Sequence, residues 1–292
     1  MSVTTVALQQ VSARRRFTDR VMRGVLVVAT LIALVPLILI LYFLLRRGLS
    51  AWTSSGFFTT DPTGSFFGNP GGIRSAILGS LVMVLLASLI AIPIGIGVAL
   101  YLTEYGKDSW FANLVRYFID VMTGVPSIMF GLFIYIVLVT AHVGGGFTAW
   151  KGSIALSLLM VPIVVRSAEV VLLLVPSSLR EAALALGAPR WRVITRVVLP
   201  TAAPGLVTGS LLAVARGMGE TAPLLFTVTA AFGLTFNLGA LMNSLPVLIY
   251  NDIQSPRTAI VNIAWGAGLA LVVLVLLLNI IARFIASRSR MT

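Results

Sequence analysis

Long apolar stretches recur along the sequence, separated by short segments rich in charge, glycine or proline. A helix needs about 20 apolar residues to cross the roughly 30 Å hydrocarbon core of a bilayer. Hydrophobic residues make up 58% of the chain and charged residues only 10%, which is too little charge to cover a water-soluble surface. The sequence therefore predicts an all-α polytopic membrane protein. Its six predicted transmembrane helices are 25–45, 74–103, 114–141, 152–176, 202–230 and 259–284.

The basic residues predict how these spans are oriented. Arginine and lysine are enriched in the cytoplasmic segments that flank membrane helices. Six spans with a cytoplasmic N-terminus place most basic residues inside, and a seventh crossing in 231–256 would weaken that bias. We therefore expect both termini in the cytoplasm and 231–256 only partly entering the outer face. The predicted organisation is an N-terminal segment 1–23, a permease domain 24–285 and a tail 286–292.

Several classes of function are excluded by residues that the sequence lacks. There is no cysteine and a single histidine, His142, so thiol chemistry and a Cys/His metal site are not expected. No glycine-rich phosphate loop is present, which excludes a nucleotide site of the P-loop type. The net charge of +12 resides mainly in span-flanking segments and not on a basic helix or aromatic platform, so no nucleic-acid partner is expected.

A short helix is predicted between the fourth and fifth spans, over residues 178–187. Ser178 and Glu181 have the spacing of a capping box, and Gly187 with Pro189 supplies a stop signal. A helix this short is marginal alone in water and needs a surface to pack on. That surface is either a partner protein or the lipid interface, which local physics does not separate. Its apolar stripe consists of Leu179, Ala182, Ala183 and Leu186.

Two pairs of charged residues lie inside predicted spans: Arg166 with Glu169, and Arg216 with Glu220. A charge at the bilayer centre costs about 2.5–3.5 kcal/mol on insertion scales, so these side chains should face protein or water. One interpretation is that each pair only joins helices. The other is that an arginine presents its planar fork to an oxyanion that crosses the membrane.

The third predicted span carries further polar residues. Arg116 and Asp120 lie four residues apart near its inner end, which predicts an interfacial ion pair. Pro126 interrupts the span, where proline is tolerated if neighbours or water satisfy the freed carbonyl groups. Ser127 beside it is a candidate hydrogen-bond donor to a passing oxyanion.

The segment after the fourth span is similar to the EAA loop of bacterial ABC importer permeases. That family has the pattern EAA-x3-G-x9-I-x-L-P, and Glu181, Ala182, Ala183, Gly187, Leu199 and Pro200 match it, with Val197 in place of Ile. The resemblance implies that this helix docks in a cleft of an ATP-binding subunit and couples its closure to the membrane helices. The implied coupling residues are Leu179, Glu181, Ala182, Ala183, Leu186 and Gly187.

A second resemblance concerns the cargo. Residues 215–225, ARGMGETAPLL, look like the fifth-span signature of phosphate permeases of the PstA branch, and segments 92–97, 101–105, 124–127 and 130–133 resemble the same family. Together the resemblance covers about residues 70–285. It implies the type I ABC importer permease fold and a non-catalytic subunit of a phosphate importer in the bacterial cytoplasmic membrane. The implied substrate pathway contains Ser127, Arg166, Glu169, Arg216 and Glu220.

The same resemblance implies the partners. These are a PstC-like second permease, a homodimeric PstB-like ATP-binding subunit and a PstS-like extracytoplasmic phosphate-binding protein, together with membrane lipid. No cofactor is expected on this chain, because ATP and Mg²⁺ belong to the partner ATPase. An importer for another oxyanion such as sulfate or molybdate, and a channel or scaffold outside the ABC class, are the alternatives.

Overall fold

The computed structural model describes residues 13–64, 68–107 and 109–288, and the chain divides into two units at Arg46 and Arg47. The first unit contains most of helix α1 (Ala13–Trp52), which is 40 residues long. Its described side chains up to Tyr42 are all exposed, and its most apolar stretch has a mean hydropathy of 3.0. An apolar surface on all sides is what a helix surrounded by lipid requires.

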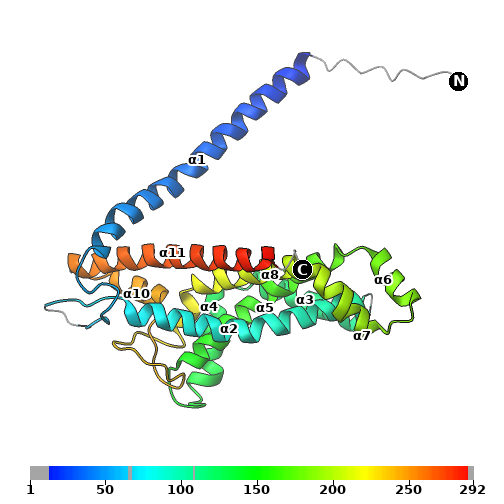
Figure 1. Ribbon diagram of the computed structural model, residues 1–292. Helices are drawn as coiled ribbons and strands as arrows, with labels where there is room; N and C mark the ends of the chain where they lie inside the picture. Colours follow the sequence, from blue (N-terminus) through cyan, green and yellow to red (C-terminus); the bar gives the residue numbers. More distant parts are fainter. Residues whose placement is uncertain (1–12, 65–67, 108, 289–292) are drawn as a thin grey trace. The chain divides into compact units, whose positions relative to one another are not determined.

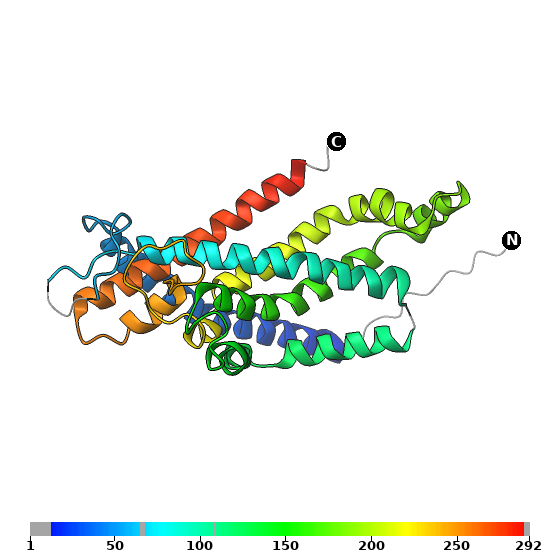
Figure 2. The same cartoon turned by 90° about the horizontal axis from the view of Figure 1, so that it is seen from below.

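The second unit is a bundle of helices (Figures 1 and 2). Three of its helices end or begin in a π-helical turn, a feature frequent at functional sites. In chain order the elements are α2 (Arg74–Leu100), η1 (Tyr101–Tyr105), α3 (Trp110–Gly124), α4 (Ser127–Ile134), η2 (Tyr135–Val139), α5 (Ala149–Leu173), α6 (Ser177–Ala185), α7 (Arg190–Val193), η3 (Ile194–Val198), α8 (Leu199–Met218), α9 (Ala222–Leu225), α10 (Leu245–Asp252) and α11 (Thr258–Arg288).

Five helices of the described chain are long and apolar enough to cross a membrane, and a bent pair supplies the sixth span. This confirms the predicted all-α, six-span fold. The bent pair joins α3 to α4 and η2 with an angle of 102°. The bend falls at Val125 and Pro126, whose extended ψ angles are 130° and 137°, because a residue before proline disfavours the helical conformation. The break lies at the proline that the sequence predicted to interrupt this span.

The fifth span is displaced from its predicted range of 202–230. Helix runs from Arg190 through η3 and α8 to Met218, about three turns earlier than predicted at both ends. Pro200 is accommodated at the start of α8, where its missing N–H costs little because the preceding turn is π-helical. Gly219 ends the helix, and the chain between it and α11 is irregular apart from α9 and α10.

The irregular segment after α9 returns to the bundle and caps α5. The backbone N–H groups of Thr148, Ala149 and Trp150 donate to the carbonyl oxygens of Thr227, Ala240 and Leu238 at 3.1, 3.0 and 3.1 Å. The first N–H groups of a helix have no partner inside it, so these bonds replace the side-chain cap that Thr148 does not form. The stretch 231–256 therefore packs on the bundle without being a continuous helix.

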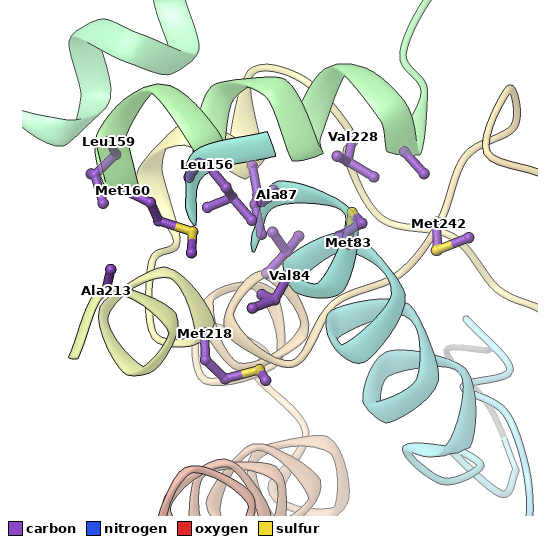
Figure 3. Close-up of a cluster of buried hydrophobic side chains, with 14 of the residues drawn as sticks. Met83, Val84, Ala87, Leu156, Leu159, Met160, Ala213, Met218, Val228 and Met242 are labelled. Atoms are coloured by element: carbon purple, nitrogen blue, oxygen red, sulfur yellow. The ribbon is translucent and has the colours of Figure 1, made fainter. Parts of the chain in front are cut away.

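The core of the bundle is rich in methionine (Figure 3). Met83 of α2, Met160 of α5, Met218 of α8 and Met242 of the returning segment are all buried in one cluster. Methionine is flexible and fills irregular gaps between elements that do not pack in regular register. This cluster fixes the end of α8, and with it the residues around Arg216, against the middle of α2 and α5.

Helix α4 contacts α9 closely at Gly131, which gives the first testable prediction. A Cβ on Gly131 would lie 2.6 Å from Pro223 Cα, and a backbone atom cannot move away cheaply. We expect Gly131→Ala to lower stability by about 1–3 kcal/mol through overpacking, seen as a lower unfolding temperature of the purified protein. Gly97→Ala is the matched control, because nothing lies within 4 Å of that position and alanine favours helix. Equal unfolding temperatures for the two variants would contradict the close contact.

Candidate functional site

Arg216 lies in the last turn of α8, directly before the helix breaks at Gly219. Its Nε is 2.8 Å from Oε1 of Glu220, as the spacing predicted. The two side chains differ in exposure, with 60% of Arg216 and 11% of Glu220 accessible. Among the described residues, the terminal nitrogens of Arg216 donate no hydrogen bond, so the planar end of the guanidinium is available to a ligand.

The depth of Arg216 in the bundle follows from its neighbour. Gly217 faces Met160, and a Cβ on Gly217 would lie 2.9 Å from Met160 Sδ. Met160 stands near the midpoint of α5, which is itself one of the spans. Arg216 therefore lies level with the midpoint of α5, at the broken end of α8. Irregular backbone at membrane depth is tolerated where it is buried in protein or lines a water-filled cavity.

Arg166 and Glu169 belong to a cluster of four charges between α5 and α3. Oε2 of Glu169 accepts from Nη1 of Arg166 at 2.9 Å, and Oε1 accepts from Nε of Arg116 at 2.9 Å. Arg166 also pairs with Asp120. The two positive and two negative charges balance, which stabilises a cluster in a low-dielectric setting.

The predicted pairing of Arg116 with Asp120 on one helix is wrong. Arg116 pairs across to Glu169, and Asp120 pairs with Arg166. Glu169 is largely buried, and a buried carboxylate needs more than one partner to offset its lost hydration. Arg116 and Asp120 lie on one face of α3, and both pair with residues of the neighbouring helix α5 instead of with each other. The spacing along α3 cannot reveal these partners.

Ser127 is the first residue of α4, directly after the bend at Pro126. Its side chain is half-buried. The described structure gives it no hydrogen bond with Arg216, Arg166 or either acid of those pairs. Ser127 therefore stands at a helix break as predicted, while its part in a pathway stays a prediction.

Helix α6 presents an unpartnered surface. None of its residues is buried, Leu179 is exposed, and Leu186 directly after it is 88% exposed. Glu181 and Ala182 are also exposed, and Ala183 is half-buried. Gly187 has a φ of +77°, the left-handed conformation that terminates helices and favours glycine. Of the predicted apolar stripe, Ala183 packs against the bundle, while Leu179, Ala182 and Leu186 are left exposed by the described chain.

The predicted capping box does not form. Pro176, with ψ of 137°, is the N-cap, α6 begins at Ser177, and no side chain caps it. Ser178 is therefore already inside the helix, where its hydroxyl cannot reach the N–H groups that a cap satisfies. Glu181 faces solvent, which leaves its carboxylate free for an external partner.

A buried contact holds α6 on the bundle, and sequence reasoning missed it. Arg180 Nε donates to Glu104 Oε1 of η1 at 3.0 Å. Its terminal nitrogens donate to the carbonyl oxygens of Val175 and Leu172 at 2.6 and 2.8 Å, at the end of α5, where carbonyl groups lack the regular helical partners four residues on. Glu104 and Arg180 are far apart in sequence, so no local pattern signals their contact.

A related bond joins the same turn to the charge cluster. Arg116 of α3 donates to the carbonyl oxygen of Leu102 in η1 at 3.0 Å and to that of Lys107 at 2.8 Å. Arg180 and Arg116 therefore both bind η1 or the residues after it, one from α6 and the other from α3. Arg180 thus connects α6 to η1, and Arg116 connects η1 to Glu169.

Comparisons with known proteins show the family of this chain. The family model described as "binding-protein-dependent transport system inner membrane component" matches residues 91–291. The chain is 41% identical over 291 residues to the "phosphate transport system permease protein PstA" of Mycobacterium leprae, covering 98% of this chain and 95% of that one. It is 41% identical over 278 residues to the protein of the same name from Yersinia pestis, covering 95% and 93%.

Solved structures share the fold. A bacterial alginate ABC transporter in complex with an alginate-bound periplasmic protein matches with a TM-score of 0.64 and 15% identity, over 94% of this chain and 97% of that one. An inward-facing MetNI methionine ABC transporter matches with a TM-score of 0.59 and 19% identity, over 75% and 94%. The chain therefore belongs to the family of binding-protein-dependent transport system inner membrane components, as a non-catalytic multi-pass permease of an ABC importer.

Proposed function

We propose that this chain is the PstA-type permease subunit of an ATP-driven importer of inorganic phosphate in the bacterial cytoplasmic membrane. The observation that carries the proposal is the arginine at the broken end of α8. Arg216 is exposed at half depth with unused donors, and the planar guanidinium fork matches two oxygens of a phosphate anion. Relatives 41% identical over nearly the whole chain are named as phosphate permeases.

The exposure of Arg216 also supports a role for a second permease. A mid-bilayer arginine open to lipid would be costly, so its exposed face should meet a water-filled path shared with a PstC-like subunit. Glu220 would keep the arginine from binding phosphate too tightly, since a paired carboxylate competes with the anion. Arg166, Glu169 and Ser127 complete the proposed pathway at other points, with Arg166 balanced by two carboxylates in this state.

The uncovered stripe of α6 supports coupling to a separate ATPase. We place a homodimeric PstB-like subunit on Leu179, Glu181, Ala182, Ala183, Leu186 and Gly187, and a PstS-like protein on the outside to deliver phosphate. ATP and Mg²⁺ would bind the ATPase, and this chain would need no cofactor. Movement of α6 would reach α3 and α5 through Arg180, Glu104 and Arg116.

The cargo is tested by competition. Vesicles that contain the assembled importer and the external binding protein should take up labelled phosphate with ATP, and excess unlabelled phosphate should abolish the signal. A thousandfold excess of sulfate or molybdate should leave uptake within about twofold. Inhibition by sulfate equal to that by phosphate would show an importer of another oxyanion, and uptake that does not need ATP would show a channel.

A further inference from the structure

A pocket of about 460 Å³ lies at the end of the bundle away from α6. Its walls come from the connection before α2, the returning segment 230–243, the end of α10 and the start of α11. Figures 1 and 2 both show these segments at one end of the bundle and α6 at the other. Connections between helices form most of the pocket wall, which places the pocket at the end of the bundle.

Asp252 is the one acid among the described residues of the pocket lining, which is mainly apolar but also includes Asn243, Asn251, Gln254 and Ser255. Pro62, Phe232, Leu248 and Ile260 are among the lining residues. Asp252 is half-buried, and it has no cationic partner among the residues that the structure describes. Two nearby arginines are engaged elsewhere. Arg74 pairs with Asp61 at 2.7 Å, and Arg257 donates to the carbonyl oxygen of Gly68 at 3.0 Å.

This lack of a partner sets Asp252 apart from the other part-buried acids. Within the described chain, Asp61, Glu104, Glu169 and Glu220 each pair with an arginine. An ionised acid that is half-buried and unpaired loses hydration without compensation.

The position of Asp252 adds a second cost. It is the last residue of α10, and a negative charge is unfavourable at the C-terminal end of a helix dipole. Burial raises the pKa of Asp252 from 3.8 to about 6, so the group is still ionised at neutral pH. A cation that entered the pocket would relieve both costs.

We infer that this pocket receives a lysine or arginine side chain of the soluble extracytoplasmic protein that delivers the cargo. The inference rests on the proposed function, because only a binding-protein-dependent importer has such a partner. A single carboxylate among mainly apolar walls that also carry amide and hydroxyl groups suits the aliphatic stem and charged head of a basic side chain. A bound metal ion would need several oxygen ligands, and the described residues contain no group of three His, Cys, Asp or Glu able to hold one.

The test measures the affinity of the phosphate-loaded binding protein for the complete importer in lipid nanodiscs at low salt. Asp252→Asn is expected to raise Kd about tenfold, and Asp252→Lys about a hundredfold, because like charges then oppose each other. High salt should shrink the difference between the unmodified and Asn forms. Asp19→Asn, which removes an exposed carboxylate from α1, is the matched control and should leave Kd unchanged.

A charge-reversal screen identifies the occupant. Acidic substitution of one exposed lysine or arginine of the binding protein should restore its affinity for the Asp252→Lys importer. Kd values that stay within twofold for both Asp252 variants would overturn the inference. Loss of the second permease from purified Asp252→Lys complexes would also overturn it, since the pocket would then serve a subunit interface. So would a rise in unfolding temperature with Na⁺ or Mg²⁺ that requires Asp252, because that result would mark a metal site.

Two controls separate the possible failures. Since the folded pKa of Asp252 lies above the unfolded value, the stability from its protonated form is complete below about pH 4 and lost as pH rises through about 6. Asp252→Asn should therefore unfold at an equal or higher temperature than the unmodified chain at pH 7.5, which excludes misfolding as the cause of weak binding. If the unmodified importer itself fails to bind a phosphate-loaded protein, the proposed cargo is wrong, whatever the variants do.

Discussion

Replacement of Arg216 by alanine is expected to reduce ATP-driven phosphate uptake at least a hundredfold, while the importer still assembles and hydrolyses ATP. The exposed guanidinium can offer two donors to the anion, and hydrogen bonds to charged groups contribute about 1.5–3 kcal/mol each. The free energy lost with two such bonds exceeds the roughly 2.8 kcal/mol that corresponds to a hundredfold change. Uptake of labelled phosphate by vesicles of matched protein content provides the measurement.

Arg216→Lys separates charge from geometry. Lysine keeps the positive charge but lacks the planar fork, so we expect intermediate uptake and a weaker preference for phosphate over sulfate. Arg216 is 60% exposed in this chain, so little packing is lost in either variant, and the unfolding temperature should change little. Normal uptake by Arg216→Ala would remove this residue from the pathway and leave its pair with Glu220 a structural one.

Leu186→Arg is expected to abolish copurification of the ATPase and, with it, all ATP-driven uptake. Leu186 is 88% exposed, so the substitution disturbs nothing within the chain. In the assembly it would place a charged side chain in an apolar contact, and a charge buried without a partner costs several kcal/mol. Affinity purification of the permease from membranes that contain all subunits, followed by quantification of the ATPase, measures the effect.

Leu184→Arg is the matched control. Two residues along a helix correspond to about 200° of rotation, so Leu184 points to the other side of α6 from Leu186. It is also exposed, and the same side chain is exchanged. We expect this variant to retain most of the ATPase. Equal loss in both variants would show that the whole helix is enclosed by the partner, and equal retention would show that α6 is not the docking element.

The sequence was most informative where the physics is local or averaged over many residues. Hydropathy over about 20 residues predicts the spans because the thickness of the bilayer sets their length. The pairs Arg166–Glu169 and Arg216–Glu220 also followed from spacing along one helix. The exposed apolar stripe around Leu186 was predicted for the same reason, since a single helical period places those residues together.

Contacts between distant segments were not predictable in this way. Glu104 and Arg180 meet because η1 and α6 reach the same end of the bundle, and the exchange of partners between Arg116 and Asp120 depends on how α3 lies beside α5. Gly217 and Gly219 in the sequence indicated that α8 ends before residue 230. The apolar residues that follow concealed it, because hydropathy does not distinguish a helix from irregular chain buried in protein.

The bonds that cap α5 join main chain to main chain, so they are indifferent to which side chains the returning segment carries. Exposed residues of this segment, such as Phe232, Leu234 and Phe236, can therefore be substituted without loosening the helix that the segment caps, whereas Val228 is fully buried in the core. Insertion or deletion of a single residue in this segment would have a larger effect. The carbonyl groups would then no longer lie opposite the N–H groups that they accept from. The cap on α5 therefore depends on the length of this segment more than on its composition.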